Sequence, residues 1–600
     1  MSILPMKRVT VAGLDEDAPS LLDGLQAMGC MHLIPLRVDQ GEGPIKDEAQ
    51  RAREALRYLL GSPIRRRELL DGADFDFRRV LEETLENRRL RIETQHQIDS
   101  LRERIEQVAP WGDFELPALE SIGGIRLWFY VVPHFRRADI RPGPLSWLTV
   151  HTDGRRDYVV LLSEDEPPEE AMPVPRSRVG TRSLSTLQAA LERAQDRFDD
   201  LQAERGALTR WIRQLLRQLG KADDEVARGQ ALRQGLRRDR VLALQGWVPE
   251  DKLPVVQAFC RRHELAVLVE DPGPEDEPPV LLRNGPSFAP GEDLVGFYQL
   301  PGYRDWDPSA LVYVAFVFFF AVILADAGYA SLVGLLTAMS WRRLGRSDSG
   351  LRLRRMGIGI SVIGIVYGIL AGSYFGIDLT PGSLASSLQL LDVNDFDAMM
   401  PLSIGVGIAH LVAANLMGAW VKRRRLSALS SLGWVAVLVG GFVVYLGVEL
   451  GLPVAAVGLG AVFLFTSERP FRGIGNLGWR AVDGLLGLTG LSRAFGDALS
   501  YLRLFALGLS SASLAATFNQ LGTELIGTGP GIGLVLALVV LIIGHGLNFV
   551  LGMVGGVVHG LRLNVIELYN WSVFGEGRPF SPLRRRSLEE VRGENRPQEI

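Results

Sequence analysis

A single arginine lies in the middle of a long apolar stretch near the C-terminus. Arg503 falls within Ala494–Phe518, and the next Lys or Arg is Arg562, near the inner end of the following apolar segment. A guanidinium keeps its proton, and a charge at the centre of a membrane costs at least ~3 kcal/mol on insertion scales. Such a charge is usually paired, hydrated or functional. Two isolated cations on neighbouring apolar segments predict a path for an ion.

Polar side chains accompany both cations. Ser510 and Thr517 follow Arg503 at seven and fourteen residues, so the three share one face of a helix. A second stripe runs from His545 to Arg562 over a rise of about 25 Å. A hydrated half-channel needs such a stripe in an otherwise apolar helix. The ion-translocating candidates are Arg503 and Arg562, and the half-channel candidates are Asp483, Asp497, Ser510, Thr517, Glu524, His545, Asn548, His559 and Glu567.

Structural interpretations compete with the functional ones. His545 is also explained as a hydrogen-bonded structural histidine, and His559 as an interface anchor beside Arg562. Arg562 is also explained as a side chain that extends to the inner membrane surface. Arg503 is also explained as a structural partner of Asp497. For His410, within Ile408–Leu411, a structural polar contact between helices is the favoured interpretation.

The composition divides the chain into two halves. The 600 residues carry a net charge of −4, with residues 1–307 rich in charge and residues 308–573 dominated by apolar residues. This pattern excludes a basic nucleic-acid binder and indicates a half-soluble, half-membrane protein. The N-terminus lacks the apolar core of a secretory signal, which predicts a cytoplasmic soluble half. Cys30 and Cys260 match no metal spacing, and we expect free thiols, no metal and no cofactor.

The soluble half combines short strands with long helices. β-type runs occur at 8–12, 31–36, 124–132, 158–162, 242–248 and 265–269. Apolar residues from Leu184 to Leu219 alternate steps of three and four, broken only by Arg205, as in a coiled coil. We predict α/β lobes joined by an antiparallel two-helix coiled coil: a proximal lobe about 1–45 and 240–290, helices about 46–108 and 184–236, and a distal lobe about 111–175. A parallel coiled-coil homodimer is the alternative.

The charges of the connecting loops predict eight membrane crossings. The candidate spans are about 308–325, 326–340, 355–375, 401–420, 428–450, 453–467, 491–521 and 531–572. Basic loops then fall inside and acidic loops outside. Asp326 becomes the turn of a hairpin rather than a charge at mid-span. The predicted organisation is therefore a cytoplasmic arm at 1–295, an all-α membrane domain at 296–580 with two long tilted C-terminal helices, and a cytoplasmic tail at 581–600.

Several motifs together resemble one family. The run Ser500–Leu509 resembles the signature helix of the membrane stator subunit, called a or I, of V-type and A-type rotary ATPases. Further matches in the family's order are Gly246–Pro249, Asp326–Tyr329, Gly368–Gly376, Gly544–Asn548 and Val558–Glu567. The motifs around Arg503 and His559–Glu567 are specific, whereas the glycine-rich ones alone are weak. The short loops are similar to those of bacterial and archaeal members.

The resemblance implies a role and a set of partners. Arg503 would displace a proton or Na⁺ from the mid-membrane carboxylate of a rotating proteolipid ring and keep two half-channels separate, with Arg562 assisting. The arm would contact coiled-coil peripheral stalks and the cap of the central rotor, while partner subunits hydrolyse or synthesise ATP. The location would be the cell membrane of a prokaryote, with the N-terminal domain and the C-terminus in the cytoplasm.

The sequence departs from eukaryotic members in one respect. Those members carry glutamates where this chain has Thr489 and Gly552. The half-channel acids must then be others, with Asp483, Asp497, Glu524 and Glu567 as candidates. The alternative functions are a polytopic secondary transporter, which an inverted repeat would support, and a membrane scaffold dimerised through its coiled coil.

Overall fold

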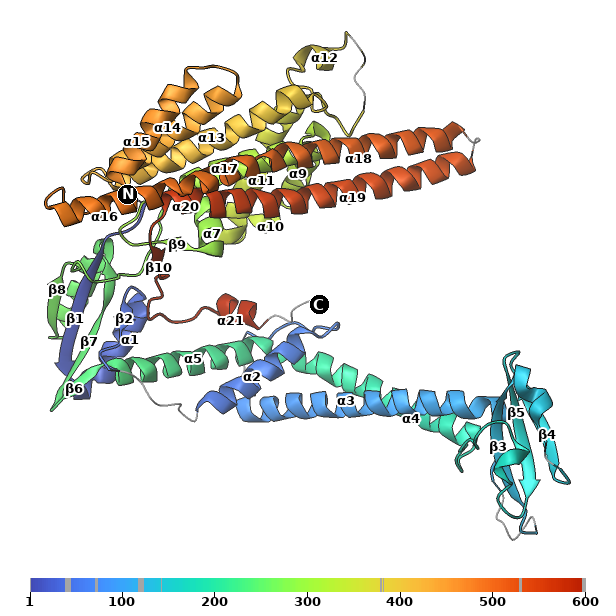
Figure 1. The fold of residues 1–600 in the computed structure, drawn as a ribbon. Coiled ribbons are helices and arrows are strands. Elements are labelled where there is room, and N and C mark those ends of the chain that lie inside the picture. The colour runs from blue at the N-terminus through green and yellow to red at the C-terminus, as the bar shows by residue number, and fades with distance from the viewer. Residues whose placement is uncertain are drawn as a thin grey trace. The chain divides into compact units, whose positions relative to one another are not determined.

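The computed structural model describes residues 2–37, 45–70, 74–116, 123–141, 143–377, 380, 382–527 and 531–595 (Figure 1). Residues 38–44 and 117–122, which belong to the predicted lobes, lie outside the described residues. The chain forms two compact units. Unit 1 comprises Met1–Gly13, Cys30–Ile34 and Ala243–Pro582, and unit 2 comprises Leu14–Gly29, Pro35–Leu242 and Leu583–Ile600.

Unit 1 contains a mainly antiparallel sheet built from distant segments. Its principal strands follow the order β2-β7-β1-β8. Val9 pairs with Val269 and Val11 with Val267, and both β1 valines are buried, so one face of the sheet is apolar. Helix α6 contacts β8. The elements are β1 (Met6–Leu14), β2 (His32–Ile34), β7 (Val241–Pro249), α6 (Leu253–Arg262) and β8 (Ala266–Glu270), with β6 (Leu236–Arg238) pairing β7.

Unit 2 is built on long helices. Helix α3 lies beside α4, and α2 lies beside α5 (Figure 1). The continuous helix predicted from Leu184 to about 236 is interrupted, because Thr209–Trp211 form a 3-10 turn between α4 and α5. The predicted helix at about 46–108 is likewise divided. The helices are α1 (Ala18–Met28), α2 (Ile45–Leu60), α3 (Phe77–Val108), α4 (Leu184–Leu208), α5 (Ile212–Gln234) and α21 (Leu588–Glu594).

Arg205, the residue that interrupts the apolar seam, is held inside unit 2. It is buried, its Nη2 donates to the Tyr58 carbonyl at 2.6 Å, and its guanidinium stacks on the Tyr58 ring at 4.2 Å. Burial lowers the pKa of Arg205, but the ring face and the carbonyl favour its charged form. The charge is therefore accommodated by α2 rather than exposed.

A second, smaller sheet lies between α3 and α4 in the sequence. Its strands are antiparallel in the order β3-β5-β4, with Phe129 opposite Val160. Trp111, Phe129 and Tyr158 form an aromatic core with edge-on contacts of 5.1 and 5.2 Å between ring centres. The strands are β3 (Arg126–Pro133), β4 (Ser146–Thr152) and β5 (Arg156–Ser163). Short 3-10 turns occur at Asp15–Asp17, Ala109–Trp111, His134–Asp139, Glu169–Ala171 and Glu250–Lys252.

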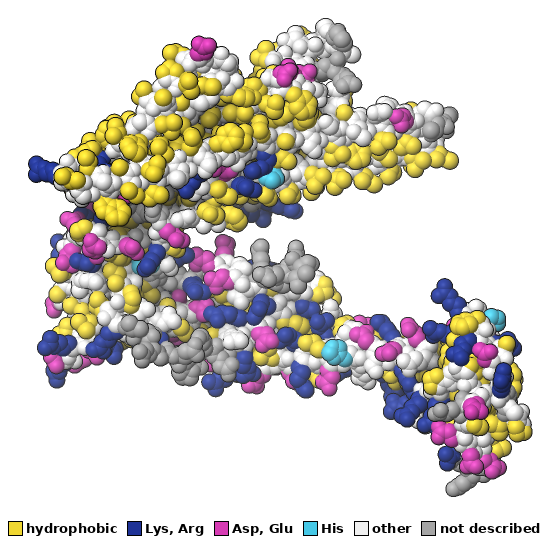
Figure 2. Space-filling model, in the orientation of Figure 1, with side chains coloured by type: hydrophobic (Ala, Val, Ile, Leu, Met, Phe, Trp, Pro, Cys, Tyr) yellow, Lys and Arg dark blue, Asp and Glu magenta, His cyan; other side chains and the backbone are white. Residues whose placement is uncertain are grey.

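The rest of unit 1 is helical and apolar. Five helical segments are long and apolar enough to cross a membrane: Asp348–Ala371, Phe396–Val421, Ala428–Tyr445, Ile474–Gly527 and Ile532–Ser572. Three shorter apolar helices are Ser309–Leu324, Ala327–Met339 and Gly451–Phe465. Hydrophobic side chains cover much of the visible surface of these helices (Figure 2). A membrane protein explains this exposure, and the number of crossings stays a prediction.

The bounds of these elements locate the candidate residues. The helices are α7 (Ala289–Tyr298), α8 (Ser309–Leu324), α9 (Ala327–Met339), α10 (Trp341–Leu344), α11 (Asp348–Ala371), α12 (Leu384–Leu388), α13 (Phe396–Val421), α14 (Ala428–Tyr445), α15 (Gly451–Phe465), α16 (Ile474–Leu488), α17 (Gly490–Ser500), α18 (Leu502–Gly527), α19 (Ile532–Arg562) and α20 (Tyr569–Ser572). A π-helical stretch, Leu563–Leu568, joins α19 to α20, and strands β9 (Leu300–Pro301) and β10 (Glu576–Gly577) pair with each other.

Candidate functional site

Arg503 is the second residue of α18, directly after a break in the helix. Tyr501 forms the junction between α17 and α18, and it is fully buried. Its hydroxyl lies 2.7 Å from Nδ1 of His410 on α13. Gly407 of α13 faces the Tyr501 ring so closely that a Cβ there would collide with it. The predicted structural contact of His410 is confirmed, and this contact fixes the backbone two residues before Arg503.

The structure brings several predicted residues together around Arg503. Arg503 interacts electrostatically with Arg562 and with Glu567, and His559 interacts with both arginines. The Nη1 atom of Arg503 is buried, and no hydrogen-bond partner for it occurs among the described residues. Within the described part of the chain no ion pair joins Arg503 to a carboxylate. A buried charged nitrogen without a partner is costly, so an acceptor from outside the chain would stabilise it.

The two acids of this cluster are held by α17 and by the π-helical stretch. Asp497 accepts a hydrogen bond from the indole nitrogen of Trp571 at 2.7 Å, so its partner is not Arg503. Glu567 is buried, interacts with Ser500 and Asp497, and has one carboxylate oxygen without a described partner. A π-helical turn often marks a functional position, because it shifts one side chain out of helical register.

A second group of polar side chains links α9, α18 and α19. The Tyr329 hydroxyl lies 2.7 Å from Nδ1 of His545, and Nε2 of His545 lies 3.0 Å from Oδ1 of Asn519. Asn548 is buried and donates to the Tyr329 hydroxyl at 3.1 Å and to the Ser511 carbonyl at 2.9 Å. The predicted His545 and Asn548 therefore lie in one hydrogen-bonded chain, whose other members the sequence did not single out.

The remaining candidates lie apart from these two groups. Ser510, Thr517 and Glu524 are exposed on α18, and Thr517 bonds to the carbonyl of Ser513 in its own helix. Asp483 lies on α16, where Ser467 donates to it at 2.7 Å and Arg469 approaches to 3.3 Å. The structure thus gives Ser510, Thr517 and Glu524 an outward-facing position, and it gives Asp483 a local ion pair.

Asp326 lies at the break between α8 and α9. Its carboxylate caps α9 by accepting from the Tyr329 amide at 2.9 Å, and the Ser373 hydroxyl donates to it at 2.8 Å. The side chain is 3% exposed. Ala325 before it has a left-handed backbone with φ of 51°. The two short helices therefore join through a sharp turn whose acid is satisfied locally.

Close packing determines which side of α19 is free. Gly552, Gly556 and Gly560 lie four residues apart and face Leu324, Phe320 and Phe316 of α8. A Cβ at Gly552 would lie 3.0 Å from Leu324. A side chain at position 552 would therefore require the Leu324 methyl group of α8 to shift by a few tenths of an ångström. Valines and leucines on the other side of α19 are exposed, as the hydrophobic surface along α19 shows (Figure 2).

The functional candidates that the sequence missed are those whose partners are distant in the chain. Tyr329, Tyr501, Ser511 and Asn519 all bond to predicted residues or support them. Tyr329 and Tyr501 lie within the motifs Asp326–Tyr329 and Ser500–Leu509, and their place in these motifs is the sequence signal that could have identified them. Ser511 and Asn519 are small polar residues in an apolar helix, a pattern too common to single them out.

No protein-family model matches the chain. Curated relatives do match it over most of its length. The chain is 28% identical over 580 residues to V-type ATP synthase subunit I of Chlamydia pneumoniae, covering 81% of this chain and 83% of the relative. It is 25% identical over 645 residues to V-type ATP synthase subunit I 1 of Treponema pallidum, covering 97% and 100%. It is 28% identical over 445 residues to A-type ATP synthase subunit I of Methanocaldococcus jannaschii, covering 67% and 64%.

A crystal structure of the cytoplasmic N-terminal domain of subunit I, a homologue of subunit a of V-ATPase, covers 44% of this chain and 99% of its own. Its TM-score is 0.22 at 18% identity, which is too weak a likeness to support an argument about the fold.

The long apolar helices of unit 1 fit a membrane subunit. The curated relatives indicate which kind of membrane subunit it is. The chain is a homologue of subunit I of V-type and A-type ATP synthases, and such a subunit assembles with other ATP synthase subunits.

Proposed function

We propose that this chain is the stator subunit of a V/A-type rotary ATPase and supplies the ion path beside a rotating proteolipid ring. One observation carries the proposal. Arg503 has a buried nitrogen for which the described residues supply no partner, and it lies on α18, whose neighbour α19 has an exposed apolar side. A mid-membrane carboxylate on a ring subunit is the acceptor that would satisfy this charge.

The chemistry of the path follows from charge and burial. A permanent cation favours the ionised form of a nearby carboxylate, so the ring carboxylate releases its H⁺ or Na⁺ beside Arg503. Once the carboxylate leaves the cation and enters lipid, desolvation favours the neutral, loaded form. Arg562 adds positive charge on α19, and Glu567 with Asp497 supplies titratable acid close to Arg503.

The two polar groups of unit 1 suit two separate half-channels. Asp497, Glu567 and Arg562 belong to one, and Tyr329, His545, Asn519 and Asn548 belong to the other. Arg503 stands between α17 and the remainder of α18, where a fixed charge repels a cation that would pass directly from one half-channel to the other. The ion flow is coupled to ATP hydrolysis or synthesis, which takes place in partner subunits.

The partners follow from the same assignment. The proteolipid ring lies against α18 and α19 in the lipid bilayer, coiled-coil peripheral stalks bind the helices of unit 2, and the cap of the central rotor lies near them. The membrane is the cell membrane of a prokaryote, with the arm and the C-terminus in the cytoplasm.

Replacement of Arg503 by lysine tests the proposal. Lysine keeps the charge but loses the planar fork that can hold a carboxylate at two points. In membrane vesicles we expect Arg503→Lys to assemble with the partner subunits but to lose ATP-driven acidification or Na⁺ uptake. Arg472→Lys, at an exposed arginine of the same unit, is the matched control. Ion transport by Arg503→Lys at the rate of the control would refute the role of Arg503.

A reconstitution separates this function from its two alternatives. A secondary transporter would carry an ion-gradient-driven flux when the chain is reconstituted alone. A scaffold would support assembly and leave ATP-driven transport unchanged in Arg503→Lys. The proposal expects no flux from the chain alone and loss of transport in the variant.

A further inference from the structure

The end of the chain returns to the helices of unit 2. Residues 583–595 follow the segment that leaves α20, and they belong to unit 2 rather than to unit 1. They contain α21, which begins with a capping box in which Ser587 and Glu590 each bond to the backbone of the other. Helix α21 contacts α5. The capping box favours a helix at this position even though α21 is only seven residues long.

One apolar side chain anchors α21. Val591 is fully buried and joins an apolar cluster that includes Leu56 of α2 with Leu215 and Leu219 of α5. A Cβ placed on Gly220 of α5 would lie 3.8 Å from a methyl group of Val591. Val591 therefore lies within van der Waals distance of position 220 of α5.

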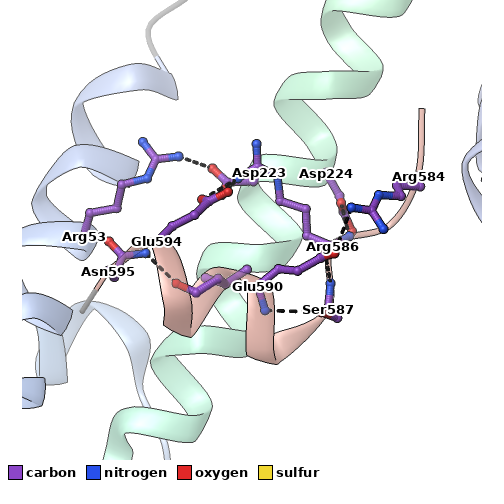
Figure 3. Close-up of polar contacts among 10 residues, drawn as sticks. Arg53, Asp223, Asp224, Arg584, Arg586, Ser587, Glu590, Glu594 and Asn595 are labelled. Carbon is purple, nitrogen blue, oxygen red and sulfur yellow. Dashed lines mark hydrogen bonds and ion pairs between the residues drawn. The ribbon is translucent and has the colours of Figure 1, made fainter. Parts of the chain in front are cut away.

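Arg586 adds a polar clamp beside the anchor (Figure 3). Its guanidinium lies 3.4 Å from Asp223 and 2.8 Å from Glu594, and its backbone amide donates to Asp224 at 3.2 Å. Asp223 is also paired with Arg53 of α2. The clamp therefore joins α2, α5 and the C-terminal segment through one buried aspartate.

A second ion pair holds the other side of α21. Arg592 pairs with Glu68, in the segment that follows α2, and the two side chains are 36% and 32% exposed. Ion pairs with this exposure are weak individually and are screened by salt. A seven-residue helix held by a single fully buried apolar side chain, by such pairs and by the pair between Arg586 and the buried Asp223 is the kind of contact that opens without unfolding the rest of a unit.

We propose that residues 583–595 form a detachable latch that ties the chain leaving the last membrane helix to α2 and α5. The latch closes when Val591 enters the α2–α5 cluster and its charge pairs form, and it opens when those pairs are screened. When open, it exposes the acid Asp223 and the apolar cluster between α2 and α5. This inference concerns unit 2 alone and does not depend on the role of Arg503.

Accessibility of a cysteine at position 591 tests the latch in the full-length chain. In Val591→Cys the thiol is shielded when the latch is closed, so maleimide modifies it only through the open form. We expect slow modification in low salt and an acceleration of about 3- to 10-fold at 1 M NaCl, because two or three ion pairs are screened. Glu589→Cys, at an exposed position of the same helix, is the matched control and should react fast at both salt concentrations.

Charge variants and a cross-link complete the test. Arg592→Glu should accelerate modification of the cysteine at position 591, and Glu68→Arg in the same chain should restore protection. Gly220→Cys with Val591→Cys should form a disulfide under mild oxidation, whereas Gly220→Cys with Glu589→Cys should not. Modification of Val591→Cys as fast as the control in low salt, or absence of the disulfide, would show that the segment does not dock. Protection unaffected by salt and by charge reversal would show a permanent contact rather than a latch.

Discussion

The hydrogen bond between Tyr501 and His410 holds the backbone just before Arg503. Removal of one atom, the Tyr501 hydroxyl oxygen, eliminates this bond. Tyr501→Phe deletes the hydroxyl and leaves Nδ1 of His410 without its partner in a site where Tyr501 is fully buried and His410 is 7% exposed. Nε2 of His410 already has no partner among the described residues. A buried polar group left unsatisfied costs about 1–3 kcal/mol. We therefore expect Tyr501→Phe to destabilise the membrane domain by ~2 kcal/mol, about 30-fold in the unfolding equilibrium.

The assay is an unfolding titration of the purified full-length chain with a denaturing detergent. Tyr445→Phe is the matched control, because Tyr445 is 51% exposed at the end of α14 and its hydroxyl has no hydrogen bond among the described contacts. The control should shift the midpoint little. The double variant Tyr501→Phe with His410→Leu should cost less than the sum of the two single variants, because removal of both polar partners leaves no unsatisfied group.

Two results would refute this reasoning. Equal midpoints for Tyr501→Phe and Tyr445→Phe would mean that the hydrogen bond contributes nothing. A double variant whose cost equals the sum of the single costs would mean that the two side chains act independently. If the bond holds the helix break in place, ion transport should also fall in Tyr501→Phe although Arg503 itself is unchanged.

Two further predictions concern groups outside the membrane helices. Burial raises the pKa of both Cys30 and Cys260, so at pH 8 the thiols stay protonated, and we expect iodoacetamide to label neither until the chain is denatured. Burial lowers the pKa of His32 below its usual value near 6.5, and the Ser581 amide donates to its Nδ1 at 3.0 Å. The unfolded chain binds this proton more readily than the folded chain does. The contribution of His32 to the free energy of unfolding should therefore be fully present above about pH 6.5 and decrease as the pH falls below it. A thermal unfolding series from pH 7.5 to 5 measures this decrease, and His32→Asn, which cannot be protonated, should reduce it.

Local patterns in the sequence predict much of the secondary structure. The six short β-type runs are confirmed as strands, since each overlaps a strand of one of the two larger sheets. Strand β4 was missed because nearly all its side chains are exposed, including Leu148 at 67%, so no alternation of buried and exposed residues marks it. The turn at Thr209 was missed for another reason. The Thr209 hydroxyl donates to Gly206 and accepts from the amide of Arg66, a contact between residues 143 positions apart.

The candidate site shows the same limit. Helical spacing placed Ser510 and Thr517 on one face with Arg503, but it could not tell that this face is exposed rather than packed against another helix. His545 was predicted from its place in a polar stripe of one helix, whereas its partner Tyr329 lies 216 residues earlier in the chain. Periodicity reports the geometry of one helix, and the pairing of helices is fixed by close approaches such as Gly556 on Phe320. Contacts across helices are therefore the part that a single sequence leaves open.

The packing of α19 decides what can cover the Arg503 side of the membrane domain. Its glycines face α8 at intervals of four residues, so residues such as Val550, Val554 and Val558 are left on the opposite side, each more than half exposed. Lipid satisfies exposed valines as well as a protein does. It offers no acceptor to the Arg503 nitrogen that has no partner among the described residues, or to the exposed Arg562. A partner surface that is apolar over most of its area and carries an acid beside Arg503 would satisfy both the exposed valines and the arginines. The proposed ring of small proteolipids with one carboxylate each would have this surface, and it would present a new carboxylate at each step, which a static partner would not do.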